Sequence, residues 1–177
     1  MSLRDKIKQK KKVILERCFN FIAGTYPPAT SQLLKQEKDR FLNPVGYTVQ
    51  NEIETIFDEL TGEMNSSRLY KALEGIIKIR AVQDFSPSEA VGFVFMLKKA
   101  VRETAGSVER GAWSKEHNTK KEESMMVNEL LEFEQRIDGI ALMAFDIYME
   151  CREKIHNIKI KEIKHGAGES GFSFSRE

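Results

Sequence analysis

The chain has 177 residues, of which 41% are hydrophobic and 31% charged, and its formal net charge is +1. This length fits about one domain, and the near-zero charge gives no electrostatic reason to expect a nucleic acid as a partner. Because no apolar stretch approaches the ~20 residues of a membrane span and the N-terminus lacks a secretory signal, we expect a cytoplasmic protein without an integral membrane segment.

The first predicted helix starts near the N-terminus and is amphipathic. Its apolar positions recur at steps of four, seven, four and three: Leu3, Ile7, Ile14, Cys18 and Phe21. Gly24 and the Pro27-Pro28 pair end this helix. Thr30 can cap a short second helix that runs to about Leu42.

Two further helix starts carry residues suited to capping. Asn43 supplies an N-cap and Pro44 the first helical residue of a third helix, which Gly62 ends. The segment Asn65-Ser66-Ser67 offers caps for a fourth helix that continues to about Ala81.

The best-formed start lies at Ser86-Pro87-Ser88-Glu89. Ser86 can cap, Pro87 takes the first helical position, and Glu89 can reach back to complete a capping box. The following segment 90–97 is apolar on nearly all sides, so we expect this helix in the middle of the domain. The polar segment 106–123 then predicts a loop or a frayed helix.

A long final helix is predicted over about residues 123–164. Its apolar residues step by three and four, and at 1.5 Å per residue it measures ~60 Å, more than one compact domain needs. We therefore expect it to project or to pair with a second copy in a homodimer; the alternative is that it packs only on its own domain. The expected dimer seam comprises Leu130, Ile137, Ile140, Ala144, Ile147, Cys151, Ile155 and Ile158.

Together these elements predict an all-α fold of about six helices. They form a single domain over residues 1–164, and the Gly- and Ser-rich residues 165–177 form a flexible tail.

The sequence contains no recognisable pattern of catalytic or metal-binding residues. His117, His156 and His165 have no second His or Cys at ligand spacing, and Cys18 and Cys151 lie too far apart for a C-x-x-C motif. We expect no catalytic residue, no metal site and no cofactor. An enzyme that uses Cys18 with His156 stays open as a third hypothesis.

Two charged features have structural interpretations. Arg80 and Asp84 have the spacing of an ion pair within one helix, and we interpret them as a joint between two helices rather than a ligand site. The basic run over residues 6–12 has the composition of a solvated helix face rather than of a nucleic-acid or membrane contact.

Two segments resemble the RsbRD N-terminal domain family, the N-terminal domains of RsbT co-antagonist proteins of bacterial regulators. The segments are Arg40-Phe41-Leu42-Asn43-Pro44-Val45-Gly46 and Ile79-Arg80-Ala81-Val82-Gln83-Asp84-Phe85-Ser86-Pro87-Ser88-Glu89-Ala90-Val91-Gly92-Phe93. The resemblance spans roughly residues 10–160. It implies a globin-like helical bundle without haem, usually dimeric, whose last helix leads toward an output domain.

The family's output domain is not found after the long helix. In stressosome proteins that output is a STAS domain, whereas here about 15 residues follow the helix, so we expect a stand-alone member. Such a member would act through a separate regulatory or output protein.

The resemblance to a globin raises the question of what occupies the space that haem takes in a globin. No His precedes His117, so a globin-like proximal ligand is not expected. The space is either filled by side chains or holds a small apolar ligand; the candidate lining residues are Phe57, Leu73, Ile77, Phe93 and Leu97. The sequence thus predicts a non-enzymatic signalling sensor or adaptor that acts through protein–protein interaction. The alternative is a sensor of a small ligand or of haem.

Overall fold

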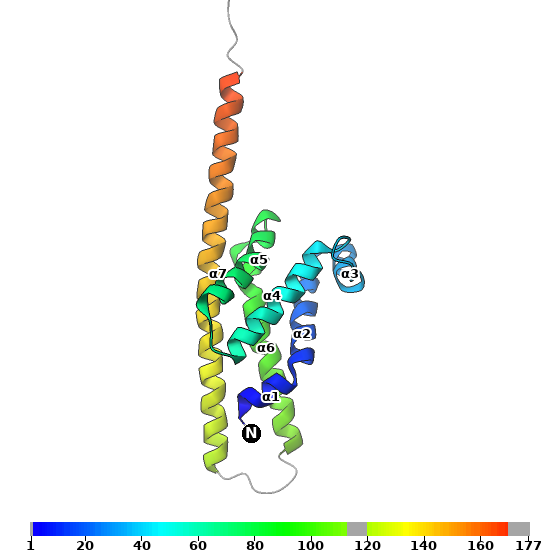
Figure 1. Ribbon diagram of the computed structural model, residues 1–177, viewed down its shortest axis with the longest axis vertical. Coiled ribbons are helices and arrows are strands. Elements are labelled where there is room, and N and C mark those ends of the chain that lie inside the picture. Colours follow the sequence, from blue (N-terminus) through cyan, green and yellow to red (C-terminus); the bar gives the residue numbers. More distant parts are fainter. Residues whose placement is uncertain (1, 113–119, 170–177) are drawn as a thin grey trace, which may run out of the picture.

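The computed structural model describes the backbone of residues 2–112 and 120–169 and the side chains of residues 2–103 and 127–164 (Figure 1). These residues contain seven α-helices and no strand, which confirms the all-α prediction. The helices are α1 (Leu3–Gln9), α2 (Lys11–Gly24), α3 (Pro28–Gln36), α4 (Pro44–Thr61), α5 (Ser66–Val82), α6 (Pro87–Ala112) and α7 (Lys120–Glu169).

The predicted first helix is divided into α1 and α2, which accounts for one helix more than expected. At Lys10 the backbone leaves the α conformation (φ −98°, ψ 10°), and its N–H donates to the carbonyl of Ile7, three residues back. The break changes the direction of the chain, so α1 packs on α6 and α7 whereas α2 packs on α4 and α6.

The second helix begins earlier and ends earlier than predicted. Pro27 is the N-cap of α3, so Thr30 lies inside the helix, and the backbone becomes extended at Glu37. The chain then turns back through residues 37–43. Phe41 and Leu42 lie in this loop, where both are exposed.

The caps of α4 and α5 are those the sequence predicted. The Asn43 side chain accepts a hydrogen bond from the N–H of Gly46, and the Asn65 side chain accepts one from the N–H of Arg68. Pro44 is the first residue of α4, and Gly62 follows its last.

The last two helices are longer than predicted. Helix α6 continues to Ala112, through part of the segment 106–123 that was expected to be a loop or frayed. Helix α7 exceeds the predicted range 123–164 at both ends. The predicted tail 165–177 therefore begins with five helical residues, and its remainder lies outside the described residues.

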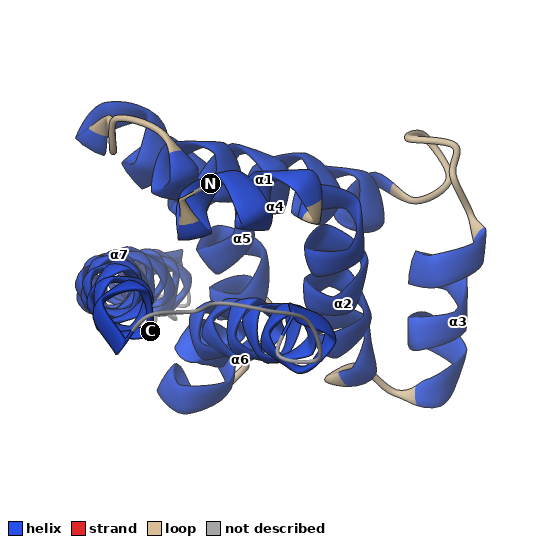
Figure 2. Ribbon diagram, turned by 90° about the horizontal axis from the view of Figure 1, so that it is seen from below, coloured by secondary structure: helices blue, strands red, loops and turns tan. Residues whose placement is uncertain are grey.

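All seven helices contribute to one hydrophobic core. Helix α7 lies at one edge of the bundle and packs on α5 and α6, whereas α3 lies at the opposite edge (Figure 2). The C-terminal part of α7 rises beyond all the other helices (Figure 1). Within the described residues, no helix is long and apolar enough to cross a membrane.

Ion pairs between α6 and α7 show how the two helices are aligned. Lys98 Nζ lies 3.0 Å from Asp138 Oδ1, and the Arg102 guanidinium donates two hydrogen bonds of 2.7 and 2.8 Å to the Glu134 carboxylate. The two helices run antiparallel, because the later residue of α6, Arg102, pairs with the earlier residue of α7, Glu134. Position 95 of α6 therefore lies about one turn beyond Asp138 along α7.

Candidate functional site

The joint between α5 and α6 is built on the predicted capping box. The backbone N–H and the hydroxyl of Ser86 both donate to the Glu89 carboxylate, at 2.9 and 2.7 Å. The N–H of Glu89 donates in return to Ser86 Oγ at 3.3 Å, and Pro87 begins the helix. The hydrogen bonds from Ser86 hold the pKa of the Glu89 carboxyl below its usual range.

Arg80 does not pair with Asp84, so that part of the sequence prediction is wrong. Its side chain is 1% exposed, and its guanidinium lies 4.1 Å from the ring centroid of Phe85 and 5.7 Å from that of Tyr26. Nη2 donates to Thr25 Oγ1 at 3.1 Å and to the carbonyl of Glu89 at 3.0 Å. Nε and Nη1 have no hydrogen-bond partner in the described part of the chain. Burial lowers the pKa of Arg80.

Asp84 instead connects the joint to α7. Its backbone is left-handed, with φ 57°, and its carboxylate accepts a hydrogen bond of 2.8 Å from Arg152 Nη1. The same nitrogen donates to the carbonyl of Ala81 at 3.1 Å, and the hydroxyl of Tyr148 donates to the carbonyl of Phe85 at 2.8 Å. The joint thus holds two successive turns of α7, which supports its interpretation as a structural joint.

The five residues predicted to line the former haem space all belong to the hydrophobic core. All are buried and belong to the single hydrophobic cluster: Phe57, Leu73, Ile77, Phe93 and Leu97. They come from α4, α5 and α6, as the prediction requires. Binding of an apolar ligand among them stays a prediction.

The predicted dimer seam packs largely inside its own protomer. Five of its eight residues are buried in the core: Ile137, Ile140, Ala144, Ile147 and Cys151. Leu130 and Ile155 are half-buried against that core, and only Ile158 is exposed. The apolar period of a helix is the same whether it packs on its own domain or on a partner, which is why the sequence did not separate the two. Dimerisation itself stays a prediction, and the buried seam residues are not available to form its contact.

A second apolar face runs along α7, and the sequence analysis missed it. We call it the outer α7 stripe; its members are exposed and comprise Val127, Leu131, Leu142, Phe145 and Met149. At 100° per residue these positions lie close together on the side of α7 opposite the buried face. Asp138 interrupts the stripe and pairs with Lys98, and the exposed Phe95 of α6 lies at the level of Leu142. The spacing of Leu142, Phe145 and Met149, which are three and four residues apart, was the sequence pattern from which this face could have been predicted.

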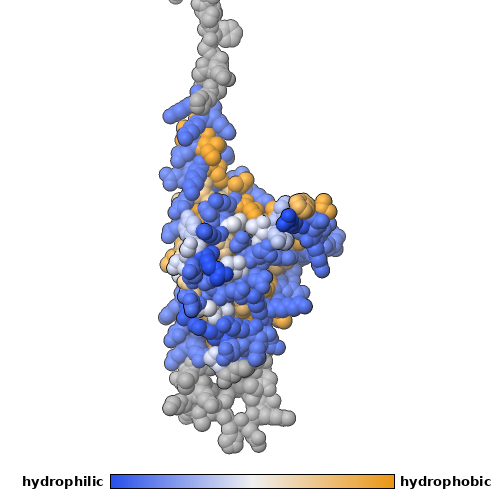
Figure 3. All heavy atoms as spheres, in the orientation of Figure 1, coloured by the Kyte–Doolittle hydropathy of each residue, from blue (hydrophilic) through white to orange (hydrophobic). Residues whose placement is uncertain are grey.

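Hydrophobic surface also appears elsewhere on the molecule. Figure 3 shows it along the projecting part of α7, where Ile158 and Ile163 are exposed, and beside α3, close to the loop of Phe41 and Leu42. Leu142 remains among the most exposed of the large apolar side chains, at 71%.

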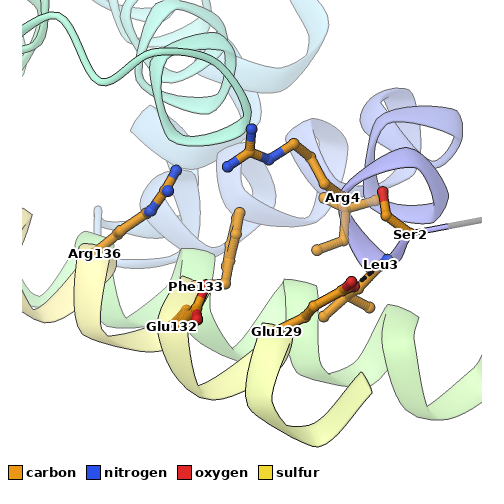
Figure 4. A pocket seen from close by; sticks show the side chains of 8 residues that line it. Ser2, Leu3, Arg4, Glu129, Glu132, Phe133 and Arg136 are labelled. Carbon is orange, nitrogen blue, oxygen red and sulfur yellow. Dashed lines mark hydrogen bonds between the residues drawn. The ribbon is translucent and has the colours of Figure 1, made fainter. Parts of the chain in front are cut away.

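A pocket lies between α1 and residues 129–136 of α7 (Figure 4). Its volume is about 290 Å³, and its lining includes Arg4, Phe133 and Arg136. The carboxylate of Glu129 crosses from α7 to accept a hydrogen bond from the N–H of Leu3. Sequence reasoning assigned no role to Arg4, because only the tertiary fold brings it to α7.

The cysteines and His156 lie on α2 and α7. No group of three or more His, Cys, Asp or Glu in the described part of the chain could hold a metal ion. Burial raises the pKa of the Cys18 thiol to about 12 and also raises the pKa of Cys151. Cys18 is buried on α2, whereas His156 is exposed on α7 beyond the joint.

A comparison with protein families matches residues 13–161 to the RsbT co-antagonist protein rsbRD N-terminal domain. The chain belongs to this family. The match covers α2 to α6 and most of α7, so the α5–α6 joint and the outer α7 stripe are both parts of the RsbRD N-terminal domain. Helix α1 precedes the matched residues.

Searches among curated proteins and among solved structures gave no significant match to the chain. The globin-like arrangement implied by the RsbRD N-terminal domain family therefore stays a prediction, whereas the all-α class and the family are established.

Proposed function

We propose that this RsbRD N-terminal domain is a non-enzymatic regulatory module of bacterial stress-response signalling in the cytoplasm. It forms a homodimer through the outer α7 stripe and presents the projecting end of α7 to a separate regulatory or output protein. Membership of a family of co-antagonist domains supports the regulatory part. The observation that carries the dimer is the outer α7 stripe itself.

The stripe has the length and composition of a helix–helix contact. It extends over about 33 Å from Val127 to Met149, at 1.5 Å per residue. Asp138 divides it into two apolar parts, Val127 with Leu131 and Leu142 with Phe145 and Met149, and grouped exposed apolar side chains of this kind mark interaction surfaces in soluble proteins. Two copies of the stripe can cover each other around a two-fold axis, since such a contact uses the same surface on both subunits. Phe95 of α6 is also exposed, at the level of Leu142 along α7.

The dimer is tested by the molar mass of the protein in solution at micromolar concentration. We expect a dimer for the unmodified chain and a monomer for Leu142→Glu, because a carboxylate at the centre of the contact would be buried without a partner. Phe41→Glu is the matched control, since Phe41 is 78% exposed and lies far from α7 at the α3–α4 loop. An unmodified chain that is monomeric at 50 µM, or equal effects of the two substitutions, would contradict the proposal.

The regulatory part is tested by the proteins that the chain retains from a native cell extract. A truncation after Lys159 removes the projecting end of α7 but keeps Arg152 and Ile155 in place. We expect the full chain to retain a protein that the truncated chain loses. If both retain the same proteins, the projecting end does not present the regulatory state.

A further inference from the structure

The pocket between α1 and α7 combines an apolar wall with two guanidinium groups. Leu3, Ile7 and Phe133 supply the wall; all three are packed in the core and expose a small part of their surface to the pocket. Arg4 and Arg136 come from different helices, and Figure 4 shows both side chains reaching toward the same space beside the Phe133 ring. The fold thus brings two positive charges to one side of an apolar surface.

Neither arginine is used by another described group. Among the residues whose side chains are described, neither guanidinium has a hydrogen-bond or carboxylate partner. Glu132 precedes Arg136 by four residues, a spacing that allows an ion pair on a helix. Figure 4, however, marks no hydrogen bond between Glu132 and Arg136, and the two form no ion pair in the described structure. The two guanidinium forks therefore remain available to an external acceptor.

The remaining charges of the pocket restrict which anion fits. Glu129 lies on the side of α1, where it accepts the hydrogen bond from Leu3. With Glu132 it brings two negative charges near the two arginines, so the pocket as a whole is neutral. A dianion such as phosphate would be repelled by these carboxylates, whereas a single carboxylate can be held by the guanidinium forks in the bidentate geometry they favour.

We propose that this pocket binds a small organic monocarboxylate, whose carboxylate lies between Arg4 and Arg136 and whose apolar body lies on Phe133. The volume of about 290 Å³ is at the lower end of the range for small-molecule sites and suits a ligand of roughly ten heavy atoms. Such a ligand joins α1 to α7 on the face away from the outer α7 stripe. The site does not depend on the dimer, and Arg4 precedes the residues that the family model matches.

The test is a titration of the full chain with sodium benzoate, followed by calorimetry or by amide chemical shifts. We expect saturable binding with shifts that gather on α1 and residues 129–136 of α7. Arg4→Gln and Arg136→Gln should each weaken binding about tenfold or more, since each removes a charge-assisted hydrogen bond. Lys161→Gln, which removes one exposed positive charge elsewhere on α7, is the matched control and should bind as the unmodified chain does.

Two further probes separate this site from a general anion site. Acetate should bind more weakly than benzoate because it lacks the apolar body, and inorganic phosphate should bind more weakly because of its second charge. The proposal is overturned if benzoate does not saturate, if Arg136→Gln binds it as tightly as Lys161→Gln, or if phosphate binds as tightly as benzoate. Arg4 and Lys161 are exposed and Arg136 is half-buried, and circular dichroism of the three variants verifies the fold.

Discussion

Arg80 is a cation in the core, and it has no anionic hydrogen-bond partner among the residues whose side chains are described. Transfer of a charge out of water is unfavourable, and two hydrogen bonds with two aromatic rings replace its hydration only in part. An arginine at this position is therefore not explained by stability alone. It lies where the ends of α2 and α5 meet the start of α6.

Replacement of Arg80 by an apolar side chain of similar length tests this account. Arg80→Met should leave the free energy of unfolding unchanged or raise it by about 1 kcal/mol, because the desolvated charge is removed and the space remains filled. Arg80→Ala should lower it by about 2–4 kcal/mol, because it leaves a cavity. Urea unfolding measures both. If Arg80→Met is destabilised as much as Arg80→Ala, the guanidinium makes a net stabilising contribution.

The buried thiol of Cys18 gives a pH dependence of stability. Its pKa is about 12 in the folded chain, against a reference of 9.0, so the folded state favours the protonated thiol. The resulting stability is fully present below pH 9 and is lost as the pH rises from 9 toward 12. At pH 10 the loss is about 1.4 kcal/mol.

The contribution of Cys18 is isolated by comparison with Cys18→Ala. Lysines and tyrosines also titrate above pH 9, but their effects are shared by both proteins. We expect the stability difference between the two, measured by urea unfolding, to shrink by about 1.4 kcal/mol between pH 8 and pH 10. A difference that stays constant over this range would show that Cys18 titrates near its ordinary pKa.

At the scale of elements, Asn43 joins two helices with one side chain. Its oxygen caps α4, and its amide nitrogen donates to the carbonyls of Leu34 and Glu37, at 3.0 and 2.9 Å, at the end of α3. Asn43 is 4% exposed, and its hydrogen bond to Leu34 is buried, whereas that to Glu37 is partly buried. This side chain determines both where α3 ends and where α4 begins.

Asn43→Ala should therefore cost more stability than an ordinary cap. Loss of a cap alone costs ~1 kcal/mol, and carbonyls left without partners in the interior add about 1–2 kcal/mol. Asn65→Ala removes the solvent-exposed cap of α5 and is the matched control, with an expected loss of ~1 kcal/mol. Thermal and urea unfolding compare the two, and equal losses would contradict the joining role of Asn43.

The sequence predicted those elements whose limits depend on local chemistry. The caps at Asn43, Asn65 and Ser86 were predicted correctly, because each acts on N–H groups within three residues. The partner of Asp84 was not, since Arg152 lies 68 residues away. Whether an apolar face packs inside the protomer depends on all the other helices, so the buried side of α7 was mistaken for a dimer seam.

At the scale of the whole molecule, the end of α7 should be separable from the folded domain. Beyond Ile155 none of the described α7 residues belongs to the hydrophobic core. Truncation after Lys159 should therefore change the free energy of unfolding by less than about 0.5 kcal/mol. Truncation after Met149 also removes Cys151, Arg152 and Ile155 and should cost about 2 kcal/mol or more. A large loss already after Lys159 would show that the projecting end supports the fold.

Tyr148 and Arg152 attach α7 to the α5–α6 joint by hydrogen bonds. A small rotation of the helix at this attachment would move its far end by a larger distance. Ile155 is the last described residue of α7 that packs on the core, and the 14 helical residues after it form an arm of about 21 Å, at 1.5 Å per residue. A rotation of about 5° at the attachment would displace the far end of this arm by ~2 Å, given its length. Repacking around Arg80 too slight to disturb the core would thus become a displacement that a protein bound to the end of the arm can register.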